Sequence, residues 1–184
     1  MLPIYNVVFN LEDDEQGLFA VSFVDAPAIE YNFLAMRKNK PLHIYMNEPR
    51  HEVVSPLLIP NQLIYRRNGN DEYYIRWSED TIKNAAMSMI MNQRLNWVTV
   101  MHPMEANPDL TYDKCLEKGV YMMRLWIIDD PKTDDAKTKY GYDLPKGTLM
   151  AHYKVYNRKL WNRIVGGELK GLSIEAVANF KMDK

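Results

Sequence analysis

Cysteine is nearly absent from this chain of 184 residues, which contains a single one, Cys115. One cysteine cannot form an internal disulfide or a cysteine-rich zinc site, so we expect a protein of a reducing compartment. An excess of either charge is also missing, because 23 Lys and Arg residues stand against 24 Asp and Glu residues. Without a basic run the chain has no electrostatic footprint for nucleic acid, and we expect no nucleic-acid partner.

Long apolar runs are missing as well. None approaches the roughly 18 to 20 residues of a membrane span, and the first ten residues, MLPIYNVVFN, lack the basic and apolar regions of a secretion signal. We therefore expect a soluble intracellular protein without a membrane partner. The sequence also lacks GxxxxGK[ST], GxGxxG, HExxH, CxxC and GxSxG, and the pair His43 and His51 is more typical of surface residues than of metal ligands. These absences predict no cofactor and no metal site.

What the sequence does contain is an alternation of apolar and polar residues typical of strands, with two helical segments. The predicted strands are residues 4–9, 18–25, 33–36, 42–46, 51–65, 73–77, 95–101, 119–129, 147–156 and 171–180, and the predicted helices are 79–93 and 158–164. We expect 4–9 and 18–25 to form a hairpin, and 130–146 to form a mobile polar loop. Together these segments predict a single α+β domain over residues 1–184, dominated by antiparallel strands.

Local signals fix some of these boundaries. Asn68-Gly69 predicts a tight hairpin turn between two strands. Ser78 is a natural N-cap, and a helical apolar stripe follows it. The stripe consists of Ile82, Ala85, Ala86, Met89 and Ile90.

Few side chains could carry nucleophilic chemistry, because the chain has four histidines and five serines, at positions 22, 55, 78, 88 and 173. His102 follows the apolar strand LNWVTV, and Ser173 lies in GLSIEA beside Gly171. A serine becomes a nucleophile when a base takes its proton and nearby N–H groups stabilise the oxyanion. One serine on a strand and one histidine at a strand end are the minimum pair for that chemistry.

Several segments in order resemble the phage head maturation (prohead) proteases, most closely the XkdF-like phage serine proteases. The resemblance runs from about residue 18 to residue 180. The segments are AVSFVDAPAIEYNFLAM, VVSPLLIPNQLIYR, SEDTIKNAA, VTVMHP, RLWIID, YGYDLPKGTLMAHYKV and LWNRIVGGELKGLSIEA.

The resemblance implies a fold like that of the herpesvirus assemblin proteases, a mainly antiparallel β-barrel surrounded by a few helices. It implies that Ser173 is the nucleophile and His102 the general base. Three residues could orient the base. Asp25, at the end of AVSFVD, is preferred. His152 would give a His-Ser-His arrangement, and Glu175 could act if His102 bridges it to Ser173.

The function implied is that of a phage serine endopeptidase acting in the host cytoplasm, inside the assembling prohead. Its implied partners are scaffold and major capsid proteins, with self-cleavage and homo-oligomer formation as further expectations. The alternative is a catalytically weak or inactive protease-fold protein that serves in capsid assembly. Arg124 favours this alternative, because XkdF-like sequences usually have an acid before the tryptophan of that strand. Arg124 could instead stabilise the oxyanion, or be an ordinary exposed strand residue.

Overall fold

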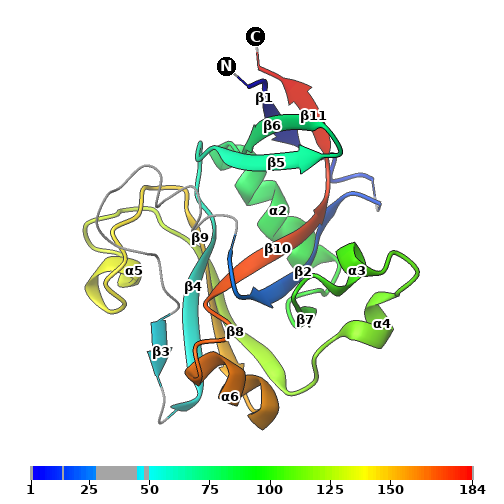
Figure 1. The fold of residues 1–184 in the computed structure, drawn as a ribbon. Helices are drawn as coiled ribbons and strands as arrows, with labels where there is room; N and C mark the ends of the chain where they lie inside the picture. Colours follow the sequence, from blue (N-terminus) through cyan, green and yellow to red (C-terminus); the bar gives the residue numbers. More distant parts are fainter. Residues whose placement is uncertain (1, 14, 28–44, 48–49, 184) are drawn as a thin grey trace.

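A computed structural model describes residues 2–13, 15–27, 45–47 and 50–183 of the chain (Figure 1). These residues form eleven strands, β1 to β11, and five helices, α2 to α6. The strands outweigh the helices, most of which are a single turn long, so the predicted α+β class is confirmed. The predicted strands at 33–36 and 42–44 lie outside the described residues.

The first sheet holds both ends of the chain. Its strands are β1 (Ile4–Val8), β5 (Ile64–Asn68), β6 (Asp71–Arg76) and β11 (Asn179–Met182), in the order β11-β1-β6-β5. β1 runs parallel to β6 and antiparallel to β11. The predicted hairpin at Asn68-Gly69 is confirmed, because Asn68 pairs with Asp71 and Gly69 has a φ of 60°, which suits a glycine.

The second sheet carries the serine and histidine singled out above. Its strands are β2 (Gly17–Val24), β7 (Val98–Val100) and β10 (Gly171–Val177), in the order β10-β2-β7. β2 is antiparallel to β10 and parallel to β7. The predicted hairpin of 4–9 with 18–25 is therefore wrong. Both segments are strands, but they do not pair with each other. The antiparallel partner of each, β11 for β1 and β10 for β2, lies near the C-terminus.

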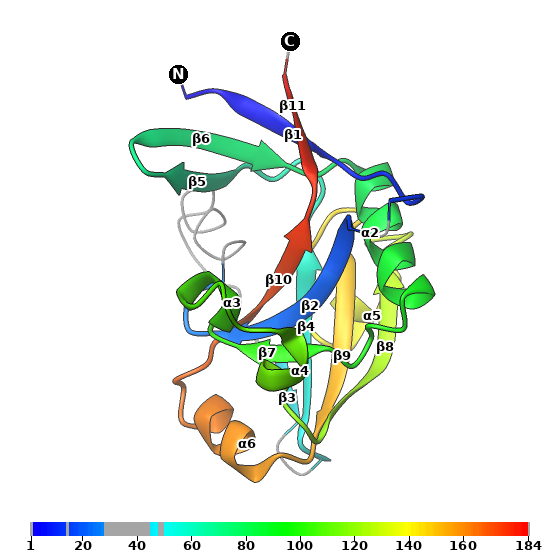
Figure 2. The ribbon, with the colours of Figure 1, turned by 90° about the vertical axis from the view of Figure 1, so that its right-hand side faces the viewer.

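The predicted strand at 171–180 is divided between two sheets. β10 ends at Val177 and β11 begins at Asn179, with Ala178 between them. Figure 2 shows the two strands following one another from the second sheet into the sheet of the chain ends. The serine strand is thus joined to the first sheet through a single residue.

The third sheet consists of β3 (Tyr45–Asn47), β4 (Glu52–Leu58), β8 (Val120–Ile127) and β9 (Leu149–Val155), in the order β3-β4-β9-β8. All its pairs are antiparallel, and the β4–β9 register shifts between Pro56 and Leu58, where proline cannot donate to the ladder. Within the described ranges the ladders make three separate sheets and no closed barrel.

The longest helix, α2 (Glu79–Met91), begins as predicted. Ser78 accepts a hydrogen bond from the Thr81 amide at 3.1 Å. Ile82 and Met89 are fully buried, whereas Ile90 is 49% exposed and does not belong to the buried stripe. The second predicted helix is α6 (Arg158–Val165). No helix within the described residues has the length and apolar character needed to cross a membrane.

The segment predicted as a mobile loop, 130–146, packs against the third sheet instead. It contains α5 (Asp135–Thr138), and Tyr142 donates a hydrogen bond to the Val54 carbonyl at 2.8 Å. Ala136, Tyr142 and Leu144 are buried in a second apolar cluster with residues of β4 and β9. The polar composition of the segment concealed these few apolar anchors.

One buried hydroxyl joins α2 to the strand beside the candidate site. Ser88 accepts a hydrogen bond from the Leu18 amide at 2.9 Å and donates to the Ala85 carbonyl at 2.8 Å. We predict that Ser88→Ala lowers the free energy of unfolding by about 1–3 kcal/mol, because the buried Leu18 N–H would lose its acceptor. Denaturant unfolding measures this loss.

The control is the neighbouring Met87→Ala, since Met87 is 46% exposed. This change should alter the free energy of unfolding by about 0.5 kcal/mol or less. Equal losses in the two variants would show that the Ser88 hydroxyl does not hold α2 to β2.

Candidate active site

Strand register places the polar side chains of the second sheet on one face. Ser173 of β10 pairs with Ser22 of β2, and Ser22 pairs in turn with Thr99 of β7. Cross-strand partners project to the same side of a sheet, and so do residues two apart on one strand. Glu175, which pairs with Ala20, therefore shares the face of Ser173. Ala20 is small, so the carboxylate can reach across it.

His102 reaches this face through a tight reversal after β7. Met101 and His102 have φ values of 59° and 46°, both in the left-handed region that residues other than glycine rarely adopt. The Met101 amide donates to the Phe23 carbonyl at 3.0 Å, and the His102 amide donates to Ser22 Oγ at 3.0 Å. Two successive strained residues are thus held in place by bonds to β2, before Pro103 opens α3 (Pro103–Ala106).

A buried carboxylate lies beside the imidazole. Glu175 Oε1 is 3.6 Å from His102 Nδ1, and the two side chains are only 8% and 20% exposed. The distance is slightly longer than a hydrogen bond, and the contact becomes an ion pair when His102 is protonated. Thr99 donates a hydrogen bond to the same carboxylate oxygen. Tyr112, at the start of α4 (Tyr112–Cys115), lies close enough to Glu175 for each group to shift the pKa of the other.

These partners decide the charge of Glu175. Burial alone would raise the pKa of this carboxyl, but the contacts with His102 and Thr99 hold the pKa below its ordinary value. The pKa of Tyr112 is raised, first by its own burial and then by the Glu175 charge. Glu175 is therefore ionised at neutral pH, in the position of an acid that orients a histidine and stabilises its charged form.

Ser173 occupies the remaining place on this face. It is 9% exposed, and within the described residues its hydroxyl makes no hydrogen bond to His102. Catalytic hydrogen bonds are often long in structures without substrate. With Glu175 beside Nδ1, the other ring nitrogen, Nε2, is the one that can exchange a proton with a serine.

Asp25, the preferred orienting acid, lies in a different position relative to the ring. It is exposed beyond the end of β2 and lines a cavity of about 350 Å³ together with His102, Met101 and Glu105. The structure thus brings Asp25 and His102 to one cavity. The buried acid next to the ring nitrogen is nevertheless Glu175, the alternative left open by the sequence.

His152, the other alternative, belongs to the third sheet. Its Nε2 lies 3.3 Å from Glu52 Oε2, with both side chains about 15% exposed, and its ring is close to Tyr140. The described contacts join it to neither Ser173 nor His102. His152 therefore stabilises the packing of β9 on β4.

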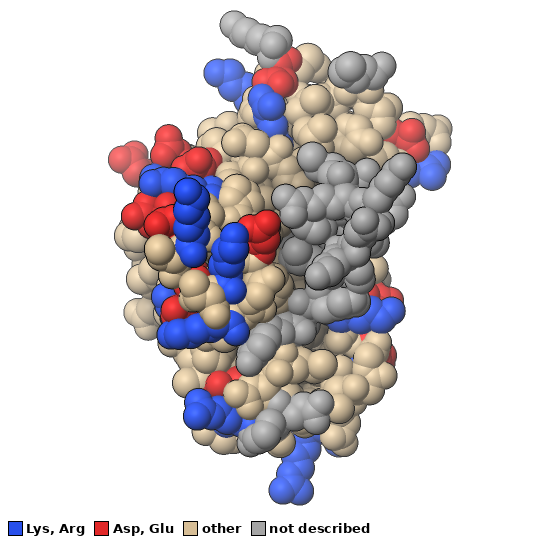
Figure 3. Space-filling model, turned by 90° about the vertical axis from the view of Figure 1, so that its left-hand side faces the viewer, with Lys and Arg blue, Asp and Glu red and all other residues tan. Residues whose placement is uncertain are grey.

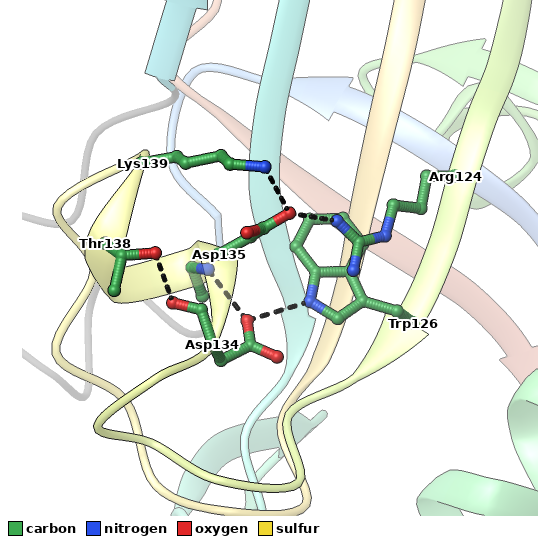
Figure 4. Close-up of polar contacts among 7 residues, drawn as sticks. Arg124, Trp126, Asp134, Asp135, Thr138 and Lys139 are labelled. Carbon is green, nitrogen blue, oxygen red and sulfur yellow. Dashed lines mark hydrogen bonds and ion pairs between the residues drawn. The ribbon is translucent and has the colours of Figure 1, made fainter.

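Arg124 also lies on the third sheet. Its guanidinium stacks over the Trp126 ring at 4.2 Å and pairs with Asp135 at 2.7 Å, and Asp134 accepts the Trp126 indole N–H (Figure 4). Lys139 binds Asp135 from the other side. Arg124 thus fastens α5 to β8, and these contacts give it no part in the Ser173 and His102 site.

Charges near α5 alternate in sign. Figure 3 shows Lys and Arg side chains interspersed with Asp and Glu side chains on the face that carries α5. Lys137 pairs with Asp143 at 3.2 Å, and Lys146 pairs with Asp129 at 2.7 Å. Such exposed pairs contribute little free energy each, and they leave no patch of one sign in this segment.

Of the two remaining histidines, His43 and His51, only His51 belongs to the described residues, and it lies away from the site. The His51 ring stacks on Trp161 at 4.6 Å and so packs against α6. His43 lies outside the described residues. Within the ranges that the structure describes, no group of three or more His, Cys, Asp or Glu side chains is placed to hold a metal ion.

Sequence reasoning missed three residues of this arrangement, Ser22, Thr99 and Tyr112. Ser22 and Thr99 join the site only through the pairing of β2 with β7, and Tyr112 joins it through a short helix. No local motif marks these contacts. Ser22 lies among apolar residues of β2. This pattern could have indicated which face of the strand Ser22 occupies, but not which residues of other strands lie beside it.

Comparisons with known proteins identify no relative of this chain. No protein-family model, curated protein or solved structure matches it at a significant level.

The Glu175 carboxylate yields a pH-dependent prediction. We expect Thr99→Val, which keeps the shape but removes a donor, to lower the free energy of unfolding by about 1.5–3 kcal/mol at pH 7. A carboxyl whose pKa is lowered by folding stabilises the protein above its unfolded pKa of about 4.3, and this stabilisation is lost as the pH falls through the folded pKa. The unmodified protein and the Thr99→Val variant should therefore differ less in their free energy of unfolding below about pH 4. Denaturant unfolding at a series of pH values measures this difference.

The matched control breaks the same kind of bond at the surface. Thr133 donates to Asp130 Oδ2 at 2.9 Å in an exposed turn. Thr133→Val should change the free energy of unfolding by only about 0.5 kcal/mol. A Thr99→Val effect that stays constant from pH 7 to pH 3 would mean that the Glu175 charge is not what Thr99 stabilises.

Proposed function

We propose that this protein is a serine endopeptidase with Ser173 as nucleophile, His102 as general base and Glu175 as the acid that orients the base. The observation that carries the proposal is the buried contact of Glu175 Oε1 with His102 Nδ1, 3.6 Å long, on the sheet face that Ser173 shares. The proposal keeps the serine and the histidine expected from the sequence. It replaces Asp25 by Glu175 as the third member.

The chemistry follows from these positions. Ser173 Oγ attacks the peptide carbonyl while His102 Nε2 takes the hydroxyl proton, and Glu175 stabilises the imidazolium that forms. Backbone N–H groups stabilise the oxyanion of the tetrahedral intermediate. His102 then gives its proton to the leaving amine. Water hydrolyses the acyl-serine ester by the same steps and restores the free Ser173 hydroxyl.

The biological setting that we propose rests on the resemblance to the XkdF-like prohead proteases. In that setting the protein acts inside the assembling phage prohead in the host cytoplasm, and its substrates are scaffold and major capsid proteins. Self-cleavage and assembly of several copies belong to the same proposal. The three sheets around one core would then be the open counterpart of the herpesvirus-protease barrel.

A second candidate is a capsid-assembly component that keeps the fold without the activity. Two observations favour it. The Ser173 hydroxyl makes no hydrogen bond to His102 within the described residues, and the serine that does bond to this histidine is Ser22, whose hydroxyl accepts from the His102 amide at 3.0 Å. A site built in this way could persist as a structural element. The two candidates differ in what a serine substitution does.

We predict that Ser173→Ala abolishes cleavage of scaffold and capsid proteins in co-expressing cells and abolishes labelling by a serine-reactive fluorophosphonate probe. The Ser173 hydroxyl oxygen forms the bond to the acyl group of the substrate, so no other side chain can replace it. Ser55→Ala is the control, since Ser55 is a similarly buried serine on β4 of the third sheet. It should leave both readouts unchanged.

The result separates the two candidates. Cleavage that continues in the Ser173→Ala cells places the chemistry elsewhere. If the unmodified protein neither cleaves nor reacts with the probe, while capsids assemble only when it is present, the non-catalytic candidate is correct.

The third member can be tested separately. We predict that Glu175→Gln lowers kcat/KM by about a hundredfold or more, within the roughly 10⁴-fold range known for removal of a triad acid, because the amide no longer stabilises the imidazolium. Steady-state kinetics on a peptide substrate at pH 7 measures this loss.

Asp25→Asn is the comparison that decides between the two acids. Asp25 is exposed, so this change should leave kcat/KM and its pH profile close to those of the unmodified protein. If Asp25→Asn causes the larger loss, Asp25 orients His102 and the assignment of Glu175 is wrong.

A further inference from the structure

A cavity of about 480 Å³ adjoins the candidate site. It lies between β10 with its continuation into β11, the facing residues of the first sheet, and the short helices α3 and α4. Its size falls within the usual range of ligand pockets, about 300–1,000 Å³. Its apolar walls include Ile75, Trp77, Ile174, Ala176 and Phe180.

This cavity is continuous with the residues of the proposed mechanism. Glu175 lines it directly. Arg66 and Ile174 line both this cavity and the small void at Ser173, and Glu105 lines both this cavity and the one at His102. The cavity thus shares lining residues both with the void at Ser173 and with the cavity at His102.

The charges that line the cavity oppose one another. Burial lowers the pKa of Arg66, and the nearby Glu105 carboxylate acts in the opposite direction. The Arg66 guanidinium donates to the Tyr65 carbonyl at 3.2 Å. Glu175 is held by Thr99 and its other partners. A charged ligand would meet charges of both signs, whereas an apolar side chain would lie against aliphatic and aromatic walls.

We infer that this cavity is a specificity pocket that takes a large apolar side chain of the substrate, beside the peptide bond that is cleaved. The inference rests on the proposed function and adds its substrate class, namely polypeptides with a residue such as leucine or phenylalanine next to the scissile bond. One methylene in such a pocket discriminates substrates by about 10- to 200-fold.

The first measurement compares kcat/KM for a series of acetylated pentapeptide amides, Gly-Ala-X-Ala-Gly, in which X is alanine, leucine, phenylalanine, lysine or glutamate. The leucine and phenylalanine peptides should exceed the alanine peptide by at least about tenfold, and the lysine and glutamate peptides should not exceed it. Ala176→Phe should remove most of this preference by filling the pocket. Ala176 is exposed, so the larger ring does not disturb the core.

The matched control is Val165→Phe on α6, where Val165 is 43% exposed and lines none of these cavities. It introduces the same ring elsewhere and should leave the preference intact. If Ala176→Phe lowers kcat/KM equally for all five peptides, or if the unmodified protein cleaves the alanine peptide as well as the leucine peptide, the pocket assignment is wrong.

A binding measurement keeps the pocket separate from the catalytic proposal. In the Ser173→Ala variant, the leucine peptide should shift the amide NMR signals of Ile174 and Ala176 at concentrations where the alanine peptide does not. Selective binding without any cleavage by the unmodified protein would overturn the peptidase and leave the pocket in place. Cleavage that depends on Ser173 without selective binding would overturn the pocket and leave the peptidase in place.

Discussion

The pairing of β2 with strands on both sides is the constraint on which the rest of the site depends. β2 binds β10, about 150 residues further along the chain, in antiparallel register, and it binds β7 in parallel register. A slip of one residue in either pairing would turn the polar row to the opposite face. Ser88 of α2 fixes the beginning of β2, and the Met101 and His102 amides bind near its end. The frame is therefore held at both ends of the central strand.

Electrostatic interactions act between the polar side chains that these strand pairings bring together. A carboxylate buried as deeply as Glu175 is unfavourable unless hydrogen bonds and an opposite charge surround it. Thr99 comes from β7, His102 from the turn after it and Tyr112 from α4, so each partner depends on the correct docking of a different element. Of these partners, His102 both favours the charged form of Glu175 and lies beside its carboxylate, with Nδ1 3.6 Å from Oε1.

Features set by neighbouring residues could be predicted from the sequence, and features set by distant pairing could not. The cap at Ser78 and the turn at Gly69 depend on residues within one turn of the chain. The predicted hairpin of 4–9 with 18–25 does not form, because burial selects strand partners that are far apart in the sequence. The carboxylate next to the imidazole could not be predicted for a related reason, since nothing local marks Glu175 as the residue that β10 brings across Ala20 to His102. The packing of residues 130–146 was not predicted, because only a few residues of this polar segment are apolar and buried.

The contact of Glu175 with His102 has features that fold stability alone does not require. Buried ion pairs rarely contribute net stability, and apolar residues of similar volume often replace them without loss. Two successive left-handed residues, Met101 and His102, add strain of about 1–3 kcal/mol each. A fold that needed only to close this face could use glycine and an apolar side chain there. The chain instead retains strain and a buried charge on a sheet face that a serine, a histidine and an acid share. Backbone strain and buried charged groups of this kind are concentrated at functional sites of proteins.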